Sequence, residues 1–205
     1  MKGETVRRKL IVLGDTYCGK TWLEPCTNSA NLLQSNKLDI FNNFIRFVDV
    51  EGVKVELVTW DNTGMDGYEK LRRLSYEDAH VVLVCFDINT PDSFDNVSTF
   101  WSKEVDTYFK NVPKILVGCK ADLRENPASI KQLQLIGQVM PTIPECEDLA
   151  LKMKALAYFE TSVKNRTGLN EVFEYAAKAA LVKSGPKAKK GIRRFLSRSD
   201  IKFVR

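Results

Sequence analysis

One segment near the N-terminus contains the residue types that bind phosphate groups, at the spacing that this chemistry needs. The pattern G-x-x-x-x-G-K-[ST] is matched by Gly14, Asp15, Thr16, Tyr17, Cys18, Gly19, Lys20 and Thr21. Glycines let backbone N–H groups wrap closely around phosphate oxygens, and the start of a following helix adds positive potential. We expect Lys20 to reach the β- and γ-phosphates of a nucleotide and Thr21 to offer its hydroxyl to Mg²⁺.

A second segment, Asp61-Asn62-Thr63-Gly64, follows an apolar run that ends at Trp60. A carboxylate at the end of a strand can hold Mg²⁺, which prefers oxygen ligands, and the amide of the glycine can meet a γ-phosphate. Alone, this four-residue pattern is equally typical of an ordinary loop. Its place at a strand end, downstream of the phosphate loop, makes Asp61 and Gly64 candidates for the same site.

Two later segments carry residues that can bind a guanine base. They are Cys119, Lys120 and Asp122, after the apolar run 114–119, and Ser162, Val163 and Lys164, after the run 157–160. The Asp122 carboxylate can accept two hydrogen bonds from the guanine edge, and the aliphatic stem of Lys120 can cover the ring. The second loop can close over the base through the amide of Val163.

These four segments can form one site only if the fold brings the ends of their strands together. Short apolar runs typical of strands occur at residues 8–13, 44–50, 53–60, 80–86, 114–119 and 157–160, and helical patterns at 20–26, 67–74, 92–109, 145–154 and 169–181. Almost continuous apolar runs are typical of parallel strands covered by helices on both faces. Glu51-Gly52 predicts an antiparallel hairpin at one edge. We expect an open α/β sheet, in which ligands bind at the carboxyl ends of the strands.

Composition and charge narrow the class of protein. The chain has 205 residues, 44% hydrophobic and 28% charged, which excludes a wholly disordered chain. Five cysteines without a C-x-x-C pair, and a single histidine, argue against a disulfide scaffold or a zinc site. Residues 183–205 hold nine basic residues and one acidic residue, although the whole chain carries only +5. The rest of the chain is therefore mildly acidic, which argues against nucleic-acid binding. We expect one domain at 1–182 and a basic, flexible tail at 183–205.

Together these segments resemble those of small GTPases of the Ras superfamily, and of its Rho family in particular. The Rho-like features are Trp60-Asp61, LRRLSY at 71–76, PDSF at 91–94, VGCKADLR at 117–124 and a likeness of residues 125–138 to the Rho helical insert. The resemblance covers about residues 7–182. It implies a P-loop NTPase fold with a six-stranded, mostly parallel sheet, one antiparallel edge hairpin, about five flanking helices and a Rho-type insert.

The same resemblance implies ligands and partners. The ligands are GTP or GDP with Mg²⁺, held by the four segments described above. The partners are protein effectors and regulators that bind two switch regions, at about residues 34–47 and 65–76.

Three positions depart from the family in ways that bear on hydrolysis. Thr16 stands where the family usually has glycine, so its side chain crowds the γ-phosphate and any inserted arginine finger. Met65 stands at the position of the glutamine that orients the attacking water, which a thioether cannot do. Thr63 replaces the usual alanine. With Cys119 in place of the usual Asn or Thr, these changes resemble the Rnd subgroup, whose members resemble permanently GTP-loaded switches. We therefore assign no catalytic residue.

The first switch region departs further. Counting back from Trp60 without a gap, the family's switch threonine falls on Asp39, and the aromatic residue that edges the guanine falls on Leu32. Asp39 could still ligate Mg²⁺, but it would place a negative charge near the γ-phosphate. Pro25 is expected to kink or break the helix that follows the phosphate loop.

Three functions are compatible with this sequence. The first is a signalling protein that binds guanine nucleotide with little or no hydrolysis and engages effectors, by family resemblance in cytoskeletal or polarity signalling. The second is a slowly cycling GTPase, against which Thr16 and Met65 argue. The third is a nucleotide-free pseudoGTPase scaffold, against which the retained Lys20, Asp61 and Asp122 argue. We expect the first.

The basic tail suggests where the protein acts. Apolar residues that fall near one face of a helix are Ile192, Phe195, Leu196 and Phe203. With the surrounding basic residues, such a segment could lie on an anionic membrane. A solvated tail and a nuclear-import signal within residues 187–194 are the alternatives.

Other sequence signals indicate a protein that binds to a membrane surface and does not span the bilayer. The longest apolar run, 81–86, is far too short to span a bilayer, and the N-terminus has no signal-peptide pattern. The last cysteine is Cys146, so we expect no prenylation at the C-terminus. We expect a cytoplasmic protein that is peripheral at the inner face of a membrane.

Overall fold

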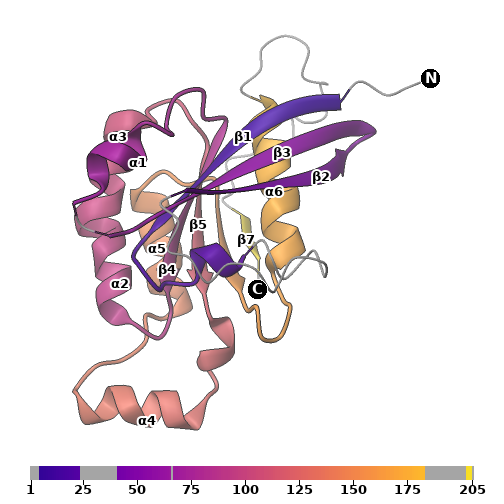
Figure 1. The fold of residues 1–205 in the computed structure, drawn as a ribbon. Helices are drawn as coiled ribbons and strands as arrows, with labels where there is room; N and C mark the ends of the chain where they lie inside the picture. Colours follow the sequence, from indigo (N-terminus) through magenta and orange to yellow (C-terminus); the bar gives the residue numbers. More distant parts are fainter. Residues whose placement is uncertain (1–4, 24–40, 66, 183–201, 205) are drawn as a thin grey trace.

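Parallel strands form most of the sheet in the computed structural model, which describes residues 5–23, 41–65, 67–182 and 202–204. The strands are β1 (Thr5–Gly14), β2 (Phe41–Val50), β3 (Val53–Asn62), β4 (Val81–Asp87), β5 (Lys114–Cys119), β6 (Ala157–Thr161) and β7 (Lys202–Val204). Their order in the sheet is β2-β3-β1-β4-β5-β6-β7 (Figure 1). Every neighbouring pair is parallel except the antiparallel β2–β3. The turn at Glu51-Gly52, where both residues have positive φ, makes that predicted hairpin.

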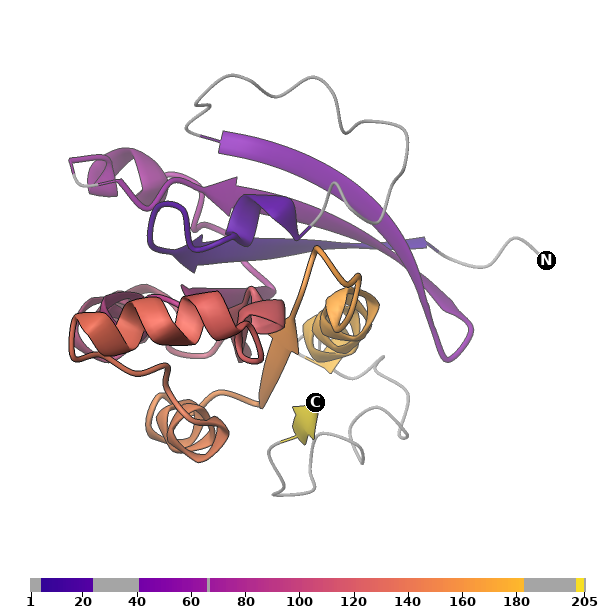
Figure 2. The ribbon, with the colours of Figure 1, turned by 90° about the horizontal axis from the view of Figure 1, so that it is seen from below.

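The helices lie on both faces of the sheet. They are α1 (Glu69–Arg73), α2 (Pro91–Asn96), α3 (Ser102–Tyr108), α4 (Pro127–Leu135), α5 (Ile143–Lys152) and α6 (Leu169–Val182), with 3-10 turns η1 (Lys20–Trp22) and η4 (Ala121–Leu123) and a π-helical turn η3 (Val97–Trp101). Figure 2 shows α5 and α6 on opposite sides of β6. Because helices cover both faces, every residue of β4 and of β5 is buried, as their apolar runs predict.

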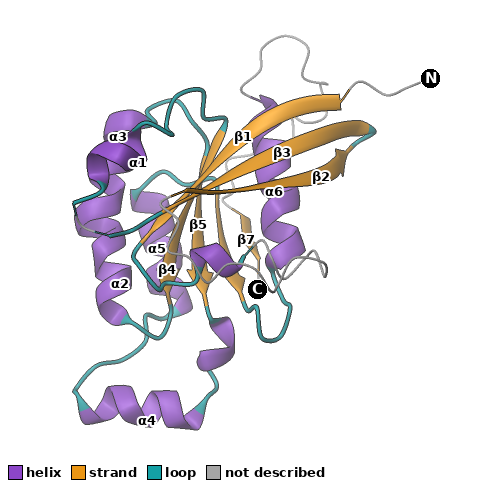
Figure 3. Cartoon of the chain, viewed as in Figure 1, coloured by secondary structure: helices purple, strands orange, loops and turns teal. Residues whose placement is uncertain are grey.

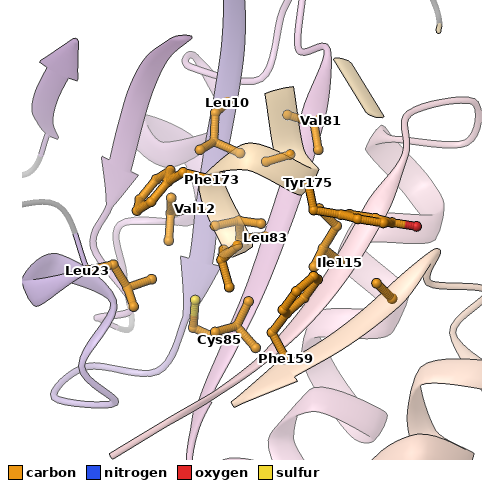
Figure 4. Close-up of a cluster of buried hydrophobic side chains, with 14 of the residues drawn as sticks. Leu10, Val12, Leu23, Val81, Leu83, Cys85, Ile115, Phe159, Phe173 and Tyr175 are labelled. Atoms are coloured by element: carbon orange, nitrogen blue, oxygen red, sulfur yellow. The ribbon is translucent and has the colours of Figure 1, made fainter. Parts of the chain in front are cut away.

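The face that carries α6 has one large apolar core. Phe173 and Tyr175 of α6 pack there with strand residues such as Leu10, Leu83 and Phe159 (Figure 4). On the other face, Trp101 and Val105 pack with Leu149 of α5 against β4 and β5. These two cores hold the central strands in fixed register, so their carboxyl ends form a rigid edge.

Local sequence signals set the ends of two helices near that edge. The Thr142 side chain accepts from the Glu145 N–H, and the Glu145 carboxylate accepts from the Thr142 N–H, which is a capping box at the start of α5. Asn126 caps α4 by accepting from the N–H groups of Ala128 and Ser129. The helix α4 lies within residues 125–138, where a Rho-type insert is expected, and it lies away from the sheet at the end toward which β4 and β5 point (Figure 3).

Some predicted elements differ from the structure. The helical pattern at 92–109 is divided by the π-helical turn η3, and the pattern at 67–74 yields only the short α1. The predicted helix at 20–26 begins as η1, while Pro25 lies outside the described residues.

Three residues of the tail form an additional strand. Phe203 lies in the short strand β7, which pairs in parallel with β6 and adds a seventh strand to the predicted six. The physical reason is that an edge strand presents unpaired N–H and C=O groups that another strand can satisfy. Within the described residues, no helix has the length and apolar character to cross a membrane.

Candidate nucleotide site

The four predicted segments lie at one edge of the sheet. The phosphate loop follows β1, the segment with Asp61 ends β3, and the two base segments follow β5 and β6. β1 pairs in parallel with β3 and with β4, β4 with β5, and β5 with β6. The four strands that carry these segments therefore point in the same direction. Their carboxyl ends therefore meet at the same edge, where an α/β sheet binds its ligands.

Glycines bring the two predicted phosphate-binding segments into contact. A Cβ on Gly14 would lie 2.3 Å from the carbonyl oxygen of Cys85, and a Cβ on Gly64 would lie 2.3 Å from the carbonyl oxygen of Gly14. The same Cβ on Gly64 would lie 2.6 Å from the backbone nitrogen of Thr16. Only glycine fits at positions 14 and 64. The backbone of Gly64 therefore lies directly against the phosphate loop.

The ammonium group of Lys20 lies inside the phosphate loop. Lys20 is only 7% exposed, and its Nζ donates to the carbonyl oxygen of Asp15 at 2.9 Å. A buried positive charge against the loop's own backbone is what a phosphate group needs there. The prediction that Lys20 belongs to the phosphate site is consistent with this position.

The side chain of Asp15 faces the helices instead of the loop interior. Its Oδ1 accepts from Trp101 Nε1 at 2.6 Å, and its Oδ2 accepts from Asn96 Nδ2 at 2.8 Å. Trp101 is the last residue of the π-helical turn η3, a kind of distortion that is frequent at functional sites. Asp15 thus ties the loop to this turn. The sequence reasoning missed both partners, because nothing in their local sequence indicates contact with the loop.

An oxygen site suited to Mg²⁺ lies beside Lys20. Asp61 is 6% exposed, and within the part of the chain that the structure describes its Oδ1 has no hydrogen-bond partner. Burial raises the pKa of Asp61, and a hydrogen bond with the Thr21 side chain and the charge of Lys20 oppose that rise. A buried carboxylate oxygen left without a partner, next to a hydroxyl, fits a hard divalent cation.

The two oxygens would need further ligands to complete a Mg²⁺ site. Within the described ranges, no group of three or more His, Cys, Asp or Glu side chains could hold a metal ion. Phosphate oxygens and water are therefore the expected remaining ligands. The predicted further ligand, Asp39, lies outside the described residues, as does Leu32.

A cavity of about 270 Å³ lies between the phosphate loop and the two base segments. Its lining residues are Gly19, Trp22, Cys119, Lys120, Asp122, Leu123, Thr161, Val163 and Lys164. The Oδ1 atom of Asp122 accepts from Ser162 Oγ at 2.6 Å, which fixes the carboxylate at the cavity. The structure therefore brings together the predicted base residues Cys119, Lys120, Asp122, Val163 and Lys164, with Ser162 as a positioning residue.

The side chain of Lys120 is held by contacts to two other elements. Its Nζ donates to the carbonyl oxygen of Tyr17 at 2.9 Å and to Asp87 Oδ2 at 2.6 Å. Lys120 itself has a positive φ of 63°. Tyr17, 84% exposed, thus contributes its carbonyl group to this arrangement, while its ring lies in solvent. The role of Asp87 was missed in the sequence, where it reads only as the polar end of an apolar strand.

Cys119 and Cys18 serve packing at this site. A Cβ on Gly19 would lie 3.2 Å from the Cβ of Cys119, so the thiol residue packs directly under the phosphate loop. Cys18 is 1% exposed, and its burial raises the pKa of the thiol to about 12.

A buried ion pair supports the segment that contains Met65. Arg72 is 1% exposed, and its NH2 donates to Glu104 Oε2 at 2.8 Å. Its NH1 donates to the carbonyl oxygen of Thr63 at 3.3 Å, and Tyr76 OH donates to Glu104 Oε1. The side chain of Met65 is 39% exposed, and its backbone N–H donates to Thr63 Oγ1 at 3.2 Å. The backbone beside the phosphate loop is anchored, while the Met65 side chain is partly exposed.

The order of these features along the sheet defines a class of protein. A phosphate loop after the first strand, a buried aspartate after the third and a base pocket after the fifth and sixth are the arrangement of a P-loop nucleotide-binding protein of the small-GTPase type.

Comparison with known proteins identifies the family. The family model described as "Ras family" matches residues 9–182. The chain is 43% identical over 191 residues to the GTP-binding protein RHO1 of Saccharomyces cerevisiae, covering 92% of this chain and 91% of that protein. It is 42% identical over 189 residues to the GTP-binding protein rho5 of Schizosaccharomyces pombe, covering 90% and 94%. The chain belongs to the Rho family of the Ras superfamily, whose members generally bind GTP or GDP with Mg²⁺ and act through effectors and regulators.

Proposed function

We propose that this protein is a guanine-nucleotide-binding signalling switch that hydrolyses GTP very slowly or not at all. One observation carries the proposal: the phosphate loop, the buried aspartate and the two base segments meet at one edge of the sheet, while Met65 occupies the position of the water-orienting glutamine. The proposal is supported by the contact of Asp122 with Ser162, by the burial of Lys20 in the phosphate loop and by the buried Asp61 oxygen that has no partner within the described residues. Binding needs these groups, whereas hydrolysis additionally needs an amide that Met65 lacks.

The phosphate loop supports the same conclusion. Thr16 carries a side chain where the family usually has none, and its backbone nitrogen lies within 2.6 Å of the position that a Cβ on Gly64 would take. The backbones of these two segments are therefore in contact. An arginine finger supplied by a regulator would have to approach the γ-phosphate past the Thr16 side chain. In these departures the chain resembles the Rnd subgroup.

Exposed apolar residues in the switch regions support effector binding. In the described part of the first region, residues 41–47, Ile45 is 50% exposed and Phe47 57% exposed. In the second region, 65–76, Leu71 is 42% exposed and Leu74 74% exposed. Large apolar side chains that remain in solvent are typical of protein-binding surfaces when they gather in patches.

The test of this proposal is the nucleotide that the purified protein carries. The full chain is denatured, and the released nucleotide is separated by chromatography and quantified. We expect GTP at close to one equivalent. Mainly GDP would favour the alternative of a slowly cycling GTPase. No nucleotide, together with no binding of added GTP or GDP, would favour the alternative of a nucleotide-free scaffold.

We also propose that the basic tail brings the protein to anionic membranes. The support is the charge of residues 183–205, with nine basic residues and one acidic residue. Co-sedimentation with phosphatidylserine vesicles should retain the full chain at low salt and release it at high salt, because the attraction between the basic tail and the anionic lipids is screened by salt. A chain ended at Val182 should remain in solution. Equal pelleting of the two chains would contradict this role.

A further inference from the structure

Trp22 lies in the wall of the base cavity, directly after the phosphate loop. Its backbone N–H donates to the carbonyl oxygen of Gly19 at 3.1 Å, so the turn that carries Lys20 and Thr21 also positions this residue. The side chain lines the cavity and is nevertheless 54% exposed, whereas Trp101 is 1% exposed. Tryptophan is highly buried on average, so a half-exposed indole at a cavity has an open surface available to a ligand.

The other walls of this cavity leave a place for a flat ring. Asp122, fixed by Ser162, supplies the hydrogen-bonding edge. Lys120 is held by Asp87 and Tyr17, so its aliphatic stem lines the cavity in a fixed position. Among the residues that line this cavity in the described part of the chain, Trp22 is the one aromatic side chain. The family's own aromatic position falls on Leu32, so an aliphatic residue stands there in this sequence.

We propose that the indole ring of Trp22 stacks on or edges the guanine base of the bound nucleotide. This inference rests on the proposed binding of guanine nucleotide and names a further residue of that site. Asp122 recognises the hydrogen-bonding edge of the base, and Trp22 covers its apolar surface. Stacking on an aromatic side chain is insensitive to the pattern of donors and acceptors, so Trp22 adds affinity and Asp122 adds selectivity.

The experiment compares three substitutions at this position in the full chain. GDP affinity is measured by calorimetry after removal of bound nucleotide, for the wild type, Trp22→Phe, Trp22→Leu and Trp22→Ala. We expect Trp22→Ala and Trp22→Leu to weaken binding about 5- to 150-fold, the range that loss of one aromatic stacking partner produces. Trp22→Phe should stay within about threefold of the wild type, because it keeps a ring. Trp60→Phe, at the end of β3 and outside the cavity, is the matched control and should leave the affinity unchanged.

Fluorescence gives a readout that a purely structural role would not change. A guanine ring in contact with an indole quenches its emission, so GDP should quench the wild type more than Trp22→Phe, at equal occupancy. The other two tryptophans, Trp60 and Trp101, are present in both proteins and contribute equally to both signals.

Each other outcome overturns the inference in a distinguishable way. If the wild type binds GDP and Trp22→Ala binds it equally well or more tightly, Trp22 is not a base contact, and the proposed function stands. If Trp22→Leu equals Trp22→Phe, bulk and not the ring is what matters, and stacking is refuted. If the wild type binds no guanine nucleotide, the proposed function and this inference both fail.

Discussion

The two ends of the nucleotide site differ in how well they keep the chemistry of their family. At the base end, Asp122 is fixed by Ser162, and Lys120 is fixed by Asp87 and Tyr17. At the hydrolytic end, Thr16 stands in the phosphate loop, and the Met65 side chain is 39% exposed. The backbone around that end is nevertheless well anchored through Gly64 and Arg72.

The difference teaches that binding and hydrolysis depend on separable parts of one fold. Binding uses glycines, a buried lysine and carboxylates that the sheet edge holds in place. Hydrolysis additionally needs a side chain that orients a water molecule, and in the function proposed above Met65 stands at that position while the surrounding backbone stays anchored. The predictions below test each end in turn.

The largest effect is expected at the base end. Asp122→Asn should shift preference from guanine to xanthine nucleotides by about 10²- to 10⁴-fold, because the carboxylate is expected to accept two charge-assisted hydrogen bonds, each contributing about 1.5–3 kcal/mol. Competition binding with GDP and XDP measures this shift. Ser162→Ala, which only releases the carboxylate, should weaken GDP binding much less. Equal binding of ATP and GTP by the wild type would contradict the assignment.

The stability of the region around Met65 should depend on the buried ion pair between Arg72 and Glu104. Arg72→Ala leaves the Glu104 carboxylate buried without its main partner, so we expect a loss of about 3–5 kcal/mol in the free energy of unfolding. Arg7→Ala is the matched control, because Arg7 pairs with Glu56 at the surface, where about 0–1 kcal/mol is typical. Urea denaturation measures both. A similar, small loss in the two variants would show that the Arg72 pair does not support this region.

Restoring the catalytic groups should raise hydrolysis only partly. The double variant Thr16→Gly/Met65→Gln should hydrolyse bound GTP about 100-fold faster than the wild type, near the low end of what a positioned catalytic group contributes. The first switch, which also departs from the family, remains unrestored. Single-turnover hydrolysis measures the rate, and Met65→Leu serves as the control. A wild-type rate that already equals that of the double variant would refute the proposed deficiency.

The smallest effect concerns the packing under the phosphate loop. Burial raises the pKa of Cys18 to about 12 from an ordinary value of 9.0, so the folded protein holds the neutral thiol at pH 8. Alkylation of Cys18, mapped by mass spectrometry, should be slow in the folded protein and fast in denaturant. The stability from the neutral thiol is fully present below pH 9 and is lost as the pH rises toward 12. Rapid alkylation of the folded protein would show that the loop opens.

Most strands could be predicted because each is a local pattern. The apolar runs of β4 and β5 are buried on both faces, and burial of this kind is what a continuous apolar run predicts. The division of the pattern at 92–109 could not be predicted, because the π-helical turn η3 is coupled to a distant contact, from Trp101 to Asp15. The strand β7 was missed for a similar reason, since only the edge of β6 gives Lys202–Val204 a partner.

The candidate site shows the same limit. The motifs name Lys20, Asp61 and Asp122, because phosphate, metal and base chemistry demand particular groups at particular strand ends. Their supporting partners carry no motif, and they include Asp87 and Trp22.

The amino-acid sequence by itself determined the class of this protein, the positions of most of its strands along the chain and the chemical identity of the groups at the sheet edge. These follow from residue type and short-range spacing, which the backbone's two periodicities translate directly into buried faces. Only the tertiary structure decided that Arg72 and Glu104 are buried together, that Asp15 is tied to η3 and that Trp22 lines the base cavity. Each of these joins residues far apart in the chain, and such contacts exist only once the packed sheet and its helices bring them within reach.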